Sequence, residues 1–330
     1  MSTGRMVTFI DAIDEALREE MERDARVFYI GEDIGKLRTR MTIDDGGLMK
    51  NIGEERVKRT PISENSFTGL AVGAAMTGLR PVVDIMYMDF ILLPTDQIIN
   101  HAAKINFMSG GQLKVPLVIR AQFGVGTREA AQHSQSLEAI FVHTPGLKVA
   151  MPSTPYDAKG MLKTAIREDS PVIFLQHRLL YGLKGNIPDR EFLVPLGEAD
   201  IKREGDDITV VATAFAVHKA LQAAEMLSGE ISVEIIDPRS LVPLDIGKIV
   251  GSVRKTKRLL VIHESCTRGG VGAEIVRRVV EKAYCDLRGP PIVLGGANSP
   301  VPYSPPLEDA WIPQVQDIVV ALKKIVNGTR

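Results

Sequence analysis

The chain contains little cysteine, only Cys266 and Cys285 among 330 residues. Their spacing fits neither a CxxC redox pair nor a zinc site, and two lone thiols indicate a reducing environment and not a disulfide framework. Excess charge of one sign is lacking too, because 40 Lys and Arg residues oppose 41 Asp and Glu residues. No general electrostatic attraction to nucleic acid or to an anionic membrane is therefore expected. A net charge this close to zero favours association with partner chains.

Long apolar runs are also missing. The longest, GLAVGAAMTGL at residues 69–79, is too short to span a bilayer and is followed by Arg80. Residues 1–10 lack the basic-then-apolar pattern of a signal peptide, so the sequence predicts a cytoplasmic location or an equivalent compartment. The P-loop signature GxxxxGK[ST] does not occur, and GGVGAE at residues 269–274 lacks the third glycine of a dinucleotide-binding turn. A plain helix entry is the favoured interpretation of that stretch.

What the chain does have is an alternation of helical and strand patterns. Residues 8–24 carry apolar side chains at the helical period, and residues 27–31 follow as a short apolar strand. Thr154 as N-cap, Pro155 as the first helical residue and Asp157 in the first turn mark the start of a later helix. Further strands are expected at 80–86, 115–120, 147–152 and 170–176, and helices at 64–78, 95–108, 136–143 and 155–168. This alternation predicts a mainly parallel sheet covered on both faces.

The alternation is interrupted once, in a stretch rich in Gly, Pro and charge, and residues 186–205 are predicted to be a linker. A second alternating run follows, with strands expected at 208–213, 231–237, 258–264 and 291–296, and helices at 216–227, 245–253, 269–284 and 315–326. The sequence therefore predicts an α/β protein with two domains, residues 1–185 and 206–330, each a mainly parallel sheet flanked by helices.

Glu64 stands just before a helix whose Gly and Ala residues allow close packing against the backbone. On one interpretation its carboxylate only complements the helix N-terminus, a stabilisation of about 1 kcal/mol or less. On the other, it lies between Ile62 and Phe67 in a poorly solvated place, where a carboxylate binds protons or protonated heterocycles strongly. Taken alone, the residue is compatible with both.

Two further groups are candidates for a site. Tyr87 and Phe90 follow a strand, at the edge where open α/β sheets bind ligands, although core packing is the simpler explanation for either ring taken singly. His133 lies in a segment of Ala, Gln and Ser after the glycine turn FGVG, where an imidazole has little packing to do. A lone histidine is more often structural, yet imidazole is the side chain best suited to exchange a proton near neutral pH.

Several stretches of the chain, taken in order, resemble one family. They are TPISENSFTGLAVGAAMTGLRP, DQIINHAAK, AAQHSQS, PGLKV, PSTPYDAKG and PVIF, joined in the second half by DPRSLVPLD and VIHE. Through them the chain resembles the beta subunit of the thiamin-diphosphate-dependent first component of 2-oxo acid dehydrogenase complexes, over essentially its whole length. AAQHSQSL followed by PSTPYDAKG resembles the pyruvate and acetoin dehydrogenase branches more than the branched-chain branch. The resemblance implies a transketolase pyrimidine-binding-like domain followed by a transketolase C-terminal-like domain.

The resemblance also implies one shared task for the candidate side chains. Glu64 would hydrogen-bond the aminopyrimidine ring of the cofactor, so that the ring's amino group can become an imino base for the thiazolium carbon. Phe90 would stack on that ring, with Ile62 beside it. His133 would lie at the mouth of the active site, where it orients the substrate, exchanges protons with the intermediate and assists acyl transfer to a lipoyl arm.

Half of the expected cofactor site is missing from the sequence. The family's thiamin enzymes bind the diphosphate through magnesium, which is held by a GDG motif and a later asparagine pair, and this chain has no GDG. Its nearest string, IDDGG at residues 43–47, lacks the asparagines. The resemblance therefore implies an alpha subunit that holds magnesium, in a heterotetramer that pairs two alpha with two beta chains. It also implies that the second domain provides beta–beta contacts and, with the C-terminal end, docks on the dihydrolipoyl acyltransferase core, whose lipoyl domain receives the acyl group.

Some members of the family bind potassium in the beta subunit, chiefly through backbone oxygens. The resemblance carries this site to Leu117, Ala165, Ile166, Glu168 and Ser170. The chain departs from the common aspartate and asparagine at Glu168 and Ser170, and the additional methylene of the glutamate moves its carboxylate.

Two other classes of protein fit part of this pattern. A self-sufficient transketolase-like enzyme requires its own diphosphate-binding domain, and the length of the chain and the missing GDG motif argue against it. A non-catalytic assembly module of the same fold would tolerate the loss of Glu64 and His133, yet both residues are present within their motifs.

Overall fold

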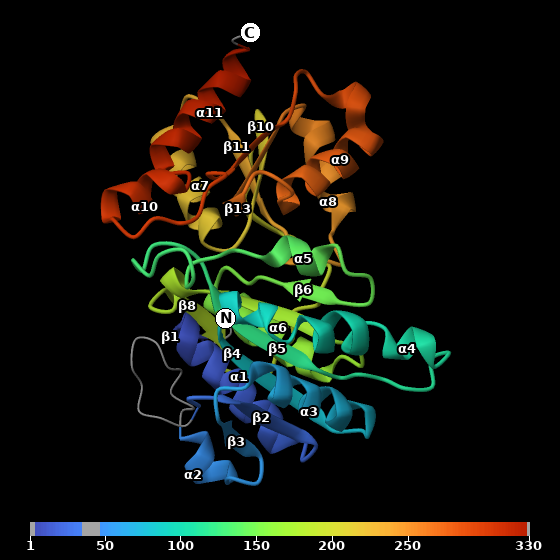
Figure 1. The fold of residues 1–330 in the computed structure, drawn as a ribbon. Helices are drawn as coiled ribbons and strands as arrows, with labels where there is room; N and C mark the ends of the chain where they lie inside the picture. The colour runs from blue at the N-terminus through green and yellow to red at the C-terminus, as the bar shows by residue number, and fades with distance from the viewer. Residues whose placement is uncertain (1–3, 35–46, 329–330) are drawn as a thin grey trace. The chain divides into compact units, whose positions relative to one another are not determined.

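The computed structural model describes residues 4–34 and 47–328. The chain divides into two compact units: the first comprises residues 1–123 and 140–196, and the second comprises residues 124–139 and 197–330. None of the helices within the described ranges has the length and apolarity that a membrane crossing needs. The prediction of an α/β protein with two mainly parallel, helix-flanked sheets is confirmed (Figure 1).

The first unit is built around one parallel sheet. Its elements are β1 (Gly4–Thr8), α1 (Phe9–Arg23), β2 (Val27–Glu32), α2 (Leu48–Ile52), β3 (Val57–Thr60), α3 (Glu64–Met76), β4 (Arg80–Tyr87), the 3₁₀ helix η1 (Met88–Leu92), the π-helix η2 (Gln97–Ala102), α4 (Ile105–Met108), β5 (Val118–Phe123), β6 (Lys148–Ala150), α6 (Pro155–Arg167), β7 (Val172–His177), the 3₁₀ helix η3 (Arg178–Leu180) and β8 (Lys184–Pro188). Within this unit the parallel strands follow the order β6, β7, β5, β4, β2, β3. Helices α1 and α6 pack on each other, and α3 packs against β4 and β2.

Helix α6 begins where the sequence predicts. Thr154 Oγ1 accepts a hydrogen bond from Asp157 N at 3.1 Å, and Pro155 is the first helical residue. Its buried Lys159 and Lys163 form ion pairs with Glu19 of α1, at 2.6 and 2.9 Å. The cap explains where the helix starts, and the ion pairs help to explain why α6 packs on α1.

One predicted helix, residues 95–108, is broken in the structure into η2 and α4. Ala103 N donates to Ile98 O, five residues earlier, which is the wide turn of a π-helix. The break lies where the chain approaches α3 closely, because a Cβ atom added to Gly69 would stand 3.3 Å from Gln97 Oε1. The prediction of a continuous helix was therefore wrong. A wide turn adds one residue to the helix, and the spacing of apolar residues over a few turns is too coarse to reveal it.

The second unit holds a sheet between two pairs of helices. Its elements are α5 (Glu138–Val142), which continues into the first unit, β9 (Asp200–Arg203), β10 (Ile208–Ala212), α7 (Phe215–Met226), β11 (Val233–Asp237), β12 (Ser240–Val242), α8 (Ile246–Thr256), β13 (Leu259–Cys266), α9 (Val271–Ala283), the 3₁₀ helix η4 (Tyr284–Asp286), β14 (Ile292–Gly296), α10 (Pro305–Trp311) and α11 (Val315–Asn327). The strand order is β14, β13, β10, β11, β9, and β9 runs antiparallel to β11. Helices α7 and α11 cover one face and α8 and α9 the other (Figure 1).

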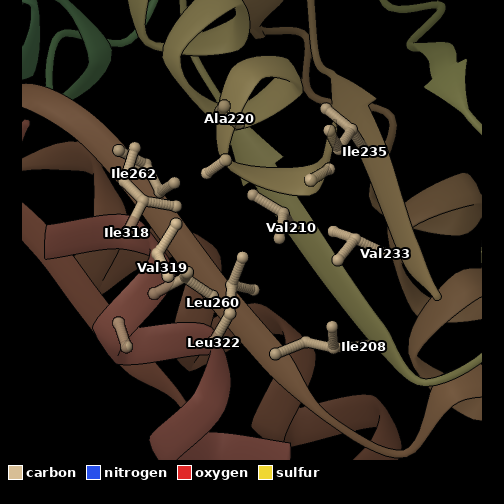
Figure 2. Packing of buried hydrophobic residues seen from close by; sticks show 14 of the residues in the cluster. Ile208, Val210, Ala220, Val233, Ile235, Leu260, Ile262, Ile318, Val319 and Leu322 are labelled. Atoms are coloured by element: carbon tan, nitrogen blue, oxygen red, sulfur yellow. The ribbon is translucent and has the colours of Figure 1, made fainter. Parts of the chain in front are cut away.

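The core on the α7 and α11 face is formed by aliphatic side chains alone. Figure 2 shows Val210, Ile235 and Leu260 of the strands packed with residues of the two helices, among them Ala220, Ile318 and Leu322. The alternation of apolar strands and amphipathic helices in the sequence is therefore satisfied by burial on both sides of the sheet.

The segment predicted as a linker, residues 186–205, contains parts of two sheets. β8 pairs with β1 in the first unit, and β9 pairs with β11 in the second. Val194, between them, is buried, and its carbonyl accepts a hydrogen bond from Thr164 Oγ1 at 2.8 Å. The Gly, Pro and charged residues interrupt the apolar periodicity, and β8 and β9 are too short to show a periodic pattern of their own. The division between the units falls after Leu196.

Candidate active site

Glu64 is the first residue of α3, and only 5% of its surface is exposed. Ser63 makes no side-chain capping bond, so the carboxylate stands at an uncapped, positive helix end. Thr68 lies one turn further on the same face of α3, is fully buried, and its Oγ1 has no hydrogen-bond partner among the described residues. A shielded carboxylate beside an unpaired hydroxyl is suited to a polar ligand or a water molecule.

Glu32, the last residue of β2, is a member of the site that sequence reasoning missed. β2 and β3 are parallel, with Glu32 opposite Thr60, so both strands end at the edge from which the chain continues to Glu64. Glu32 is 6% exposed, and its Oε2 has no partner within the described ranges. Burial, followed by the negative charges of Glu64, Asp33 and Asp84, raises the pKa of Glu32 from 4.5 to about 7. A carboxyl group that is half protonated near neutral pH therefore neighbours Glu64.

Asp84 on β4 has partners of its own. It accepts a hydrogen bond from the Tyr29 hydroxyl at 2.8 Å, and Nε of the fully buried Arg120 lies 3.6 Å from the same carboxylate. Arg120 thus balances the charge of Asp84, whereas no ion pair found in the described residues includes Glu32. Glu32 therefore has no cationic partner within the described residues to offset its burial.

At pH 8, Glu32→Gln is expected to stabilise the purified chain against heat by up to about 3 kcal/mol, because the amide cannot ionise. The folded-state pKa of Glu32, about 7, lies above its ordinary value of 4.5, so ionisation destabilises the fold as the pH rises from about 4.5 to about 7. The gain in unfolding free energy from the substitution should therefore grow across that window and stay level above it.

Thermal unfolding followed by circular dichroism between pH 5 and pH 8 measures this gain. Glu54→Gln, at an exposed position of the same unit, is the matched control and should show no such trend. A pH-independent difference for Glu32→Gln would contradict the raised pKa of Glu32.

The two aromatic candidates lie together. Tyr87 at the end of β4 and Phe90 in η1 pack edge to face, with ring centroids 5.7 Å apart. Tyr87 is buried, and Arg178 Cζ stands 5.2 Å from the centre of its ring, whereas Phe90 is only half-buried. Tyr87 therefore belongs to the core, and Phe90 keeps part of its ring accessible to a ligand at the carboxyl edge of the sheet.

Ile62 differs from the expectation that the surroundings of Glu64 are apolar on both sides. Phe67 is buried, but the side chain of Ile62 is 79% exposed. Ile62 precedes α3 and lies outside any helix or strand, so no element of secondary structure turns its side chain inward. Its role beside the cofactor stays a prediction.

His133 belongs to residues 124–139, called here the His133 segment, which groups with the second unit. The histidine is half-buried. Three hydroxyl oxygens of the segment, on Thr127, Ser134 and Ser136, are shielded from solvent and have no hydrogen-bond partner in the described chain. The polar setting read from the sequence is present, and these unpaired hydroxyls are suited to a polar ligand.

The residues of the predicted potassium site lie at the carboxyl end of α6 and just before β5 and β7; they are Leu117, Ala165, Ile166, Glu168 and Ser170. A cation of the chain itself already contacts two of their carbonyls: Arg80 Nη1 donates to Ile166 O at 3.0 Å and to Glu168 O at 2.8 Å. The Glu168 carboxylate pairs with Lys148 at 2.6 Å. Potassium would have to share these oxygens with Arg80, and the site stays a prediction.

Residues 4–34 and 47–328 contain no group of three His, Cys, Asp or Glu side chains that could hold a metal ion. Residues 43–46 of the IDDGG string lie outside the described residues. The assignment of magnesium to an alpha subunit stays a prediction.

Family models match both halves of the chain. The transketolase pyrimidine binding domain matches residues 5–184, and the transketolase C-terminal domain matches residues 197–318. A solved structure described as a split gene transketolase, inactive beta4 tetramer, shares the fold with a TM-score of 0.79 at 22% identity, over 98% of this chain and 99% of that chain. The fold and the two matched domains define a transketolase-like chain of the thiamin-diphosphate-dependent class.

Three relatives are similar over nearly the whole chain. The 2-oxoisovalerate dehydrogenase subunit beta of Bacillus subtilis (strain 168) is 42% identical over 325 residues, covering 98% of this chain and 99% of the relative. The pyruvate dehydrogenase E1 component subunit beta-2, mitochondrial, of Oryza sativa subsp. japonica is 46% identical over 328 residues (98% and 87%). The acetoin:2,6-dichlorophenolindophenol oxidoreductase subunit beta of Cupriavidus necator is 43% identical over 326 residues (96% of each). This chain belongs to the beta subunits of the thiamin-diphosphate-dependent 2-oxo acid dehydrogenases, which implies an alpha-subunit partner.

Proposed function

We propose that this chain, with its alpha subunit, catalyses the oxidative decarboxylation of a 2-oxo acid of the pyruvate type and the reductive acylation of the lipoyl group of dihydrolipoyl acyltransferase. The observation that carries the proposal is the buried pair of Glu64 and the protonatable Glu32, at the carboxyl edge of a parallel sheet. Such a pair suits a heterocycle that must gain and lose a proton. Acetoin and branched-chain 2-oxo acids are the alternative substrates, because the relatives' names include all three.

The first unit fits the aminopyrimidine half of thiamin diphosphate. Glu64 offers a shielded hydrogen-bond acceptor, Phe90 a partly open ring, and Thr68 a buried hydroxyl without a partner within the described residues. When bound, the cofactor supplies a nucleophilic carbon and an electron sink for the decarboxylation. In this proposal the alpha subunit holds the diphosphate and magnesium.

The chain's own side chains would hold and move protons. Glu64 accepts a hydrogen bond from the pyrimidine ring, and does so strongly because it is desolvated. Glu32 takes up or returns a proton at Oε2, since its pKa of about 7 makes both states available near neutral pH. His133 exchanges a proton with the substrate and assists acyl transfer, and the neighbouring Ser134 carries a buried hydroxyl that has no hydrogen-bond partner among the described residues.

The second domain has a role in assembly in this proposal. It would provide beta–beta contacts in a heterotetramer of two alpha and two beta chains, and it would dock on the dihydrolipoyl acyltransferase core. The domain bounds, residues 1–185 and 206–330, and the cytoplasmic location belong to the same proposal.

A substrate panel tests the proposed function. The chain is co-purified with its alpha subunit, and reduction of 2,6-dichlorophenolindophenol is followed with pyruvate, 3-methyl-2-oxobutanoate and acetoin. We expect pyruvate to give the highest kcat/KM, exceeding that of 3-methyl-2-oxobutanoate by about 10-fold or more, which is the discrimination that one or two additional carbon atoms provide in an apolar pocket. A higher kcat/KM with either other compound would replace the pyruvate assignment, and mass spectrometry of an added lipoyl domain reports the acyl transfer.

A further inference from the structure

The His133 segment has no helix or strand before Glu138, and yet it is fixed to the second unit. Its backbone adopts the left-handed conformation at alternate residues, with φ of 107° at Gly124, 111° at Gly126, 63° at Arg128 and 60° at Ala130. Two of these residues are not glycine, so the conformation is unfavourable unless other contacts hold it. Such alternation turns successive backbone amides toward one side and forms a nest for an anion.

A carboxylate of the second unit fills this nest. Glu308 of α10 has no exposed surface, and its Oε1 accepts hydrogen bonds from Gly126 N at 3.0 Å and from Arg128 N at 3.3 Å. Arg128 Nη1 pairs with the other carboxylate oxygen and also donates to Pro305 O at 3.0 Å. The partly exposed Arg128 Nη2 contacts Asp309 at 2.8 Å. The charge of Glu308 is therefore balanced by the His133 segment.

Two further contacts support this attachment. Glu264 of β13 accepts a hydrogen bond from Val125 N, one residue before the nest. The side chain of Val125 packs in a small apolar cluster with Val301, Trp311 and Ile312 of the same unit. The segment that carries His133 is thus held through backbone amides, one guanidinium and one apolar side chain, all before Ala130.

Burying a charged side chain costs desolvation free energy. Apolar side chains of similar volume usually stabilise as well or better, whereas a buried carboxylate left without partners is strongly destabilising. What Glu308 adds is geometry, because it binds amides that converge only when Arg128 has its left-handed conformation. The contacts therefore select one conformation of the backbone five residues before His133.

We propose that Glu308 is a positioning residue for His133, so that α10 of the second unit sets the backbone conformation of the segment that carries this side chain. The inference rests on the proposed function, since it concerns the side chain to which acyl transfer is assigned. Glu308 acts through Arg128 and the backbone of the nest, without touching the substrate.

Hydrogen exchange tests the positioning without any assay of activity. In the co-purified alpha–beta pair, Glu308→Gln should accelerate amide exchange in peptides covering residues 124–139 by about 10-fold or more, because the amides lose a charged acceptor. The matched control is Glu234→Gln in the same unit. Glu234 is 1% exposed, pairs with Lys255 and accepts from Gly205 N at 3.4 Å, so its partners lie outside the segment. It should change the exchange of residues 124–139 by less than about 2-fold.

Combining substitutions tests whether Glu308 acts through His133. Glu308→Gln alone should lower the kcat of lipoyl acylation by about 10-fold, with a smaller change in the KM for the 2-oxo acid, because misplaced groups lose transition-state contacts. In a His133→Ala background the same substitution should lower kcat by less than about 2-fold. The proposal would be overturned if the kcat losses of Glu308→Gln and His133→Ala multiplied in full in the double variant. It would also be overturned if amide exchange were unchanged in Glu308→Gln.

The two proposals fail in different ways. If the unmodified pair neither decarboxylated any compound of the panel nor acylated a lipoyl domain, the proposed function would fail by itself. The exchange of residues 124–139 would still support the positioning of the segment if it accelerated in Glu308→Gln alone, and would overturn it if Glu234→Gln had the same effect.

Discussion

The chain purified without its alpha subunit is expected to show no measurable decarboxylase activity and to bind thiamin diphosphate only weakly. The diphosphate and its magnesium carry most of the charge of the ligand, and this sequence has neither a GDG motif nor a P-loop to receive them. Contact with Phe90 and a hydrogen bond to Glu64 contribute about 2 to 4 kcal/mol together. The loss of freedom on binding offsets most of that amount.

Calorimetric titration of the cofactor, with and without magnesium, measures this directly. We expect a Kd weaker than about 100 μM for the chain alone and micromolar, magnesium-dependent binding once the alpha subunit is added. Light scattering should show a complex of defined stoichiometry once the alpha subunit is added. Micromolar, magnesium-dependent binding by the folded chain alone would contradict the division of the site between two subunits.

In the assembled enzyme, Glu64→Gln is expected to lower kcat by about 100-fold or more with the cofactor saturating. That is the factor a positioned proton-transfer group commonly provides. The amide keeps the size of the side chain, so the melting temperature should change little, since a charge at a helix N-terminus contributes only about 1 kcal/mol or less. Activity is measured by reduction of the artificial acceptor, and binding of the cofactor is measured separately.

Asp157→Asn is the matched control for this substitution. Asp157 is also a fully buried carboxylate in the first turn of a helix in the same unit, where it bonds the N-cap Thr154 at 2.6 Å. The Asp157→Asn substitution should lower the melting temperature, while the enzyme that remains folded should keep a normal kcat. Full activity of Glu64→Gln would show that Glu64 only complements its helix.

The local part of this structure could be predicted from the sequence. The cap at Thr154 and the alternation of apolar strands with helices depend on residues that are a few positions apart in the chain. These local patterns were enough to predict the α/β class and most elements. Glu64 and His133 also stood out locally, because a carboxylate beside a Gly-rich helix and an imidazole in a polar segment are unusual. The order of motifs then indicated the family.

Glu32 could not be found in this way. A glutamate at the end of an apolar strand has no local signal, and its raised pKa depends on burial and on Glu64 and Asp84, which come from α3 and β4. Only the order of the parallel strands puts these charges near one another. Local sequence features therefore identify Glu64, whereas Glu32 is identified only from the fold.

The attachment of the His133 segment is decided by tertiary structure in the same sense. The polar character of residues 124–139 was plain from their composition, but Glu308, which fixes them, lies 180 residues beyond Arg128 in the chain. Residue patterns report on propensity and periodicity over a few turns, whereas the pairing of a buried charge depends on which distant elements fold against each other. By itself the sequence determined most of the elements, the family and the two residues with unusual local chemistry. The tertiary structure decided which charges meet, because burial and electrostatic interaction act through space and not along the chain.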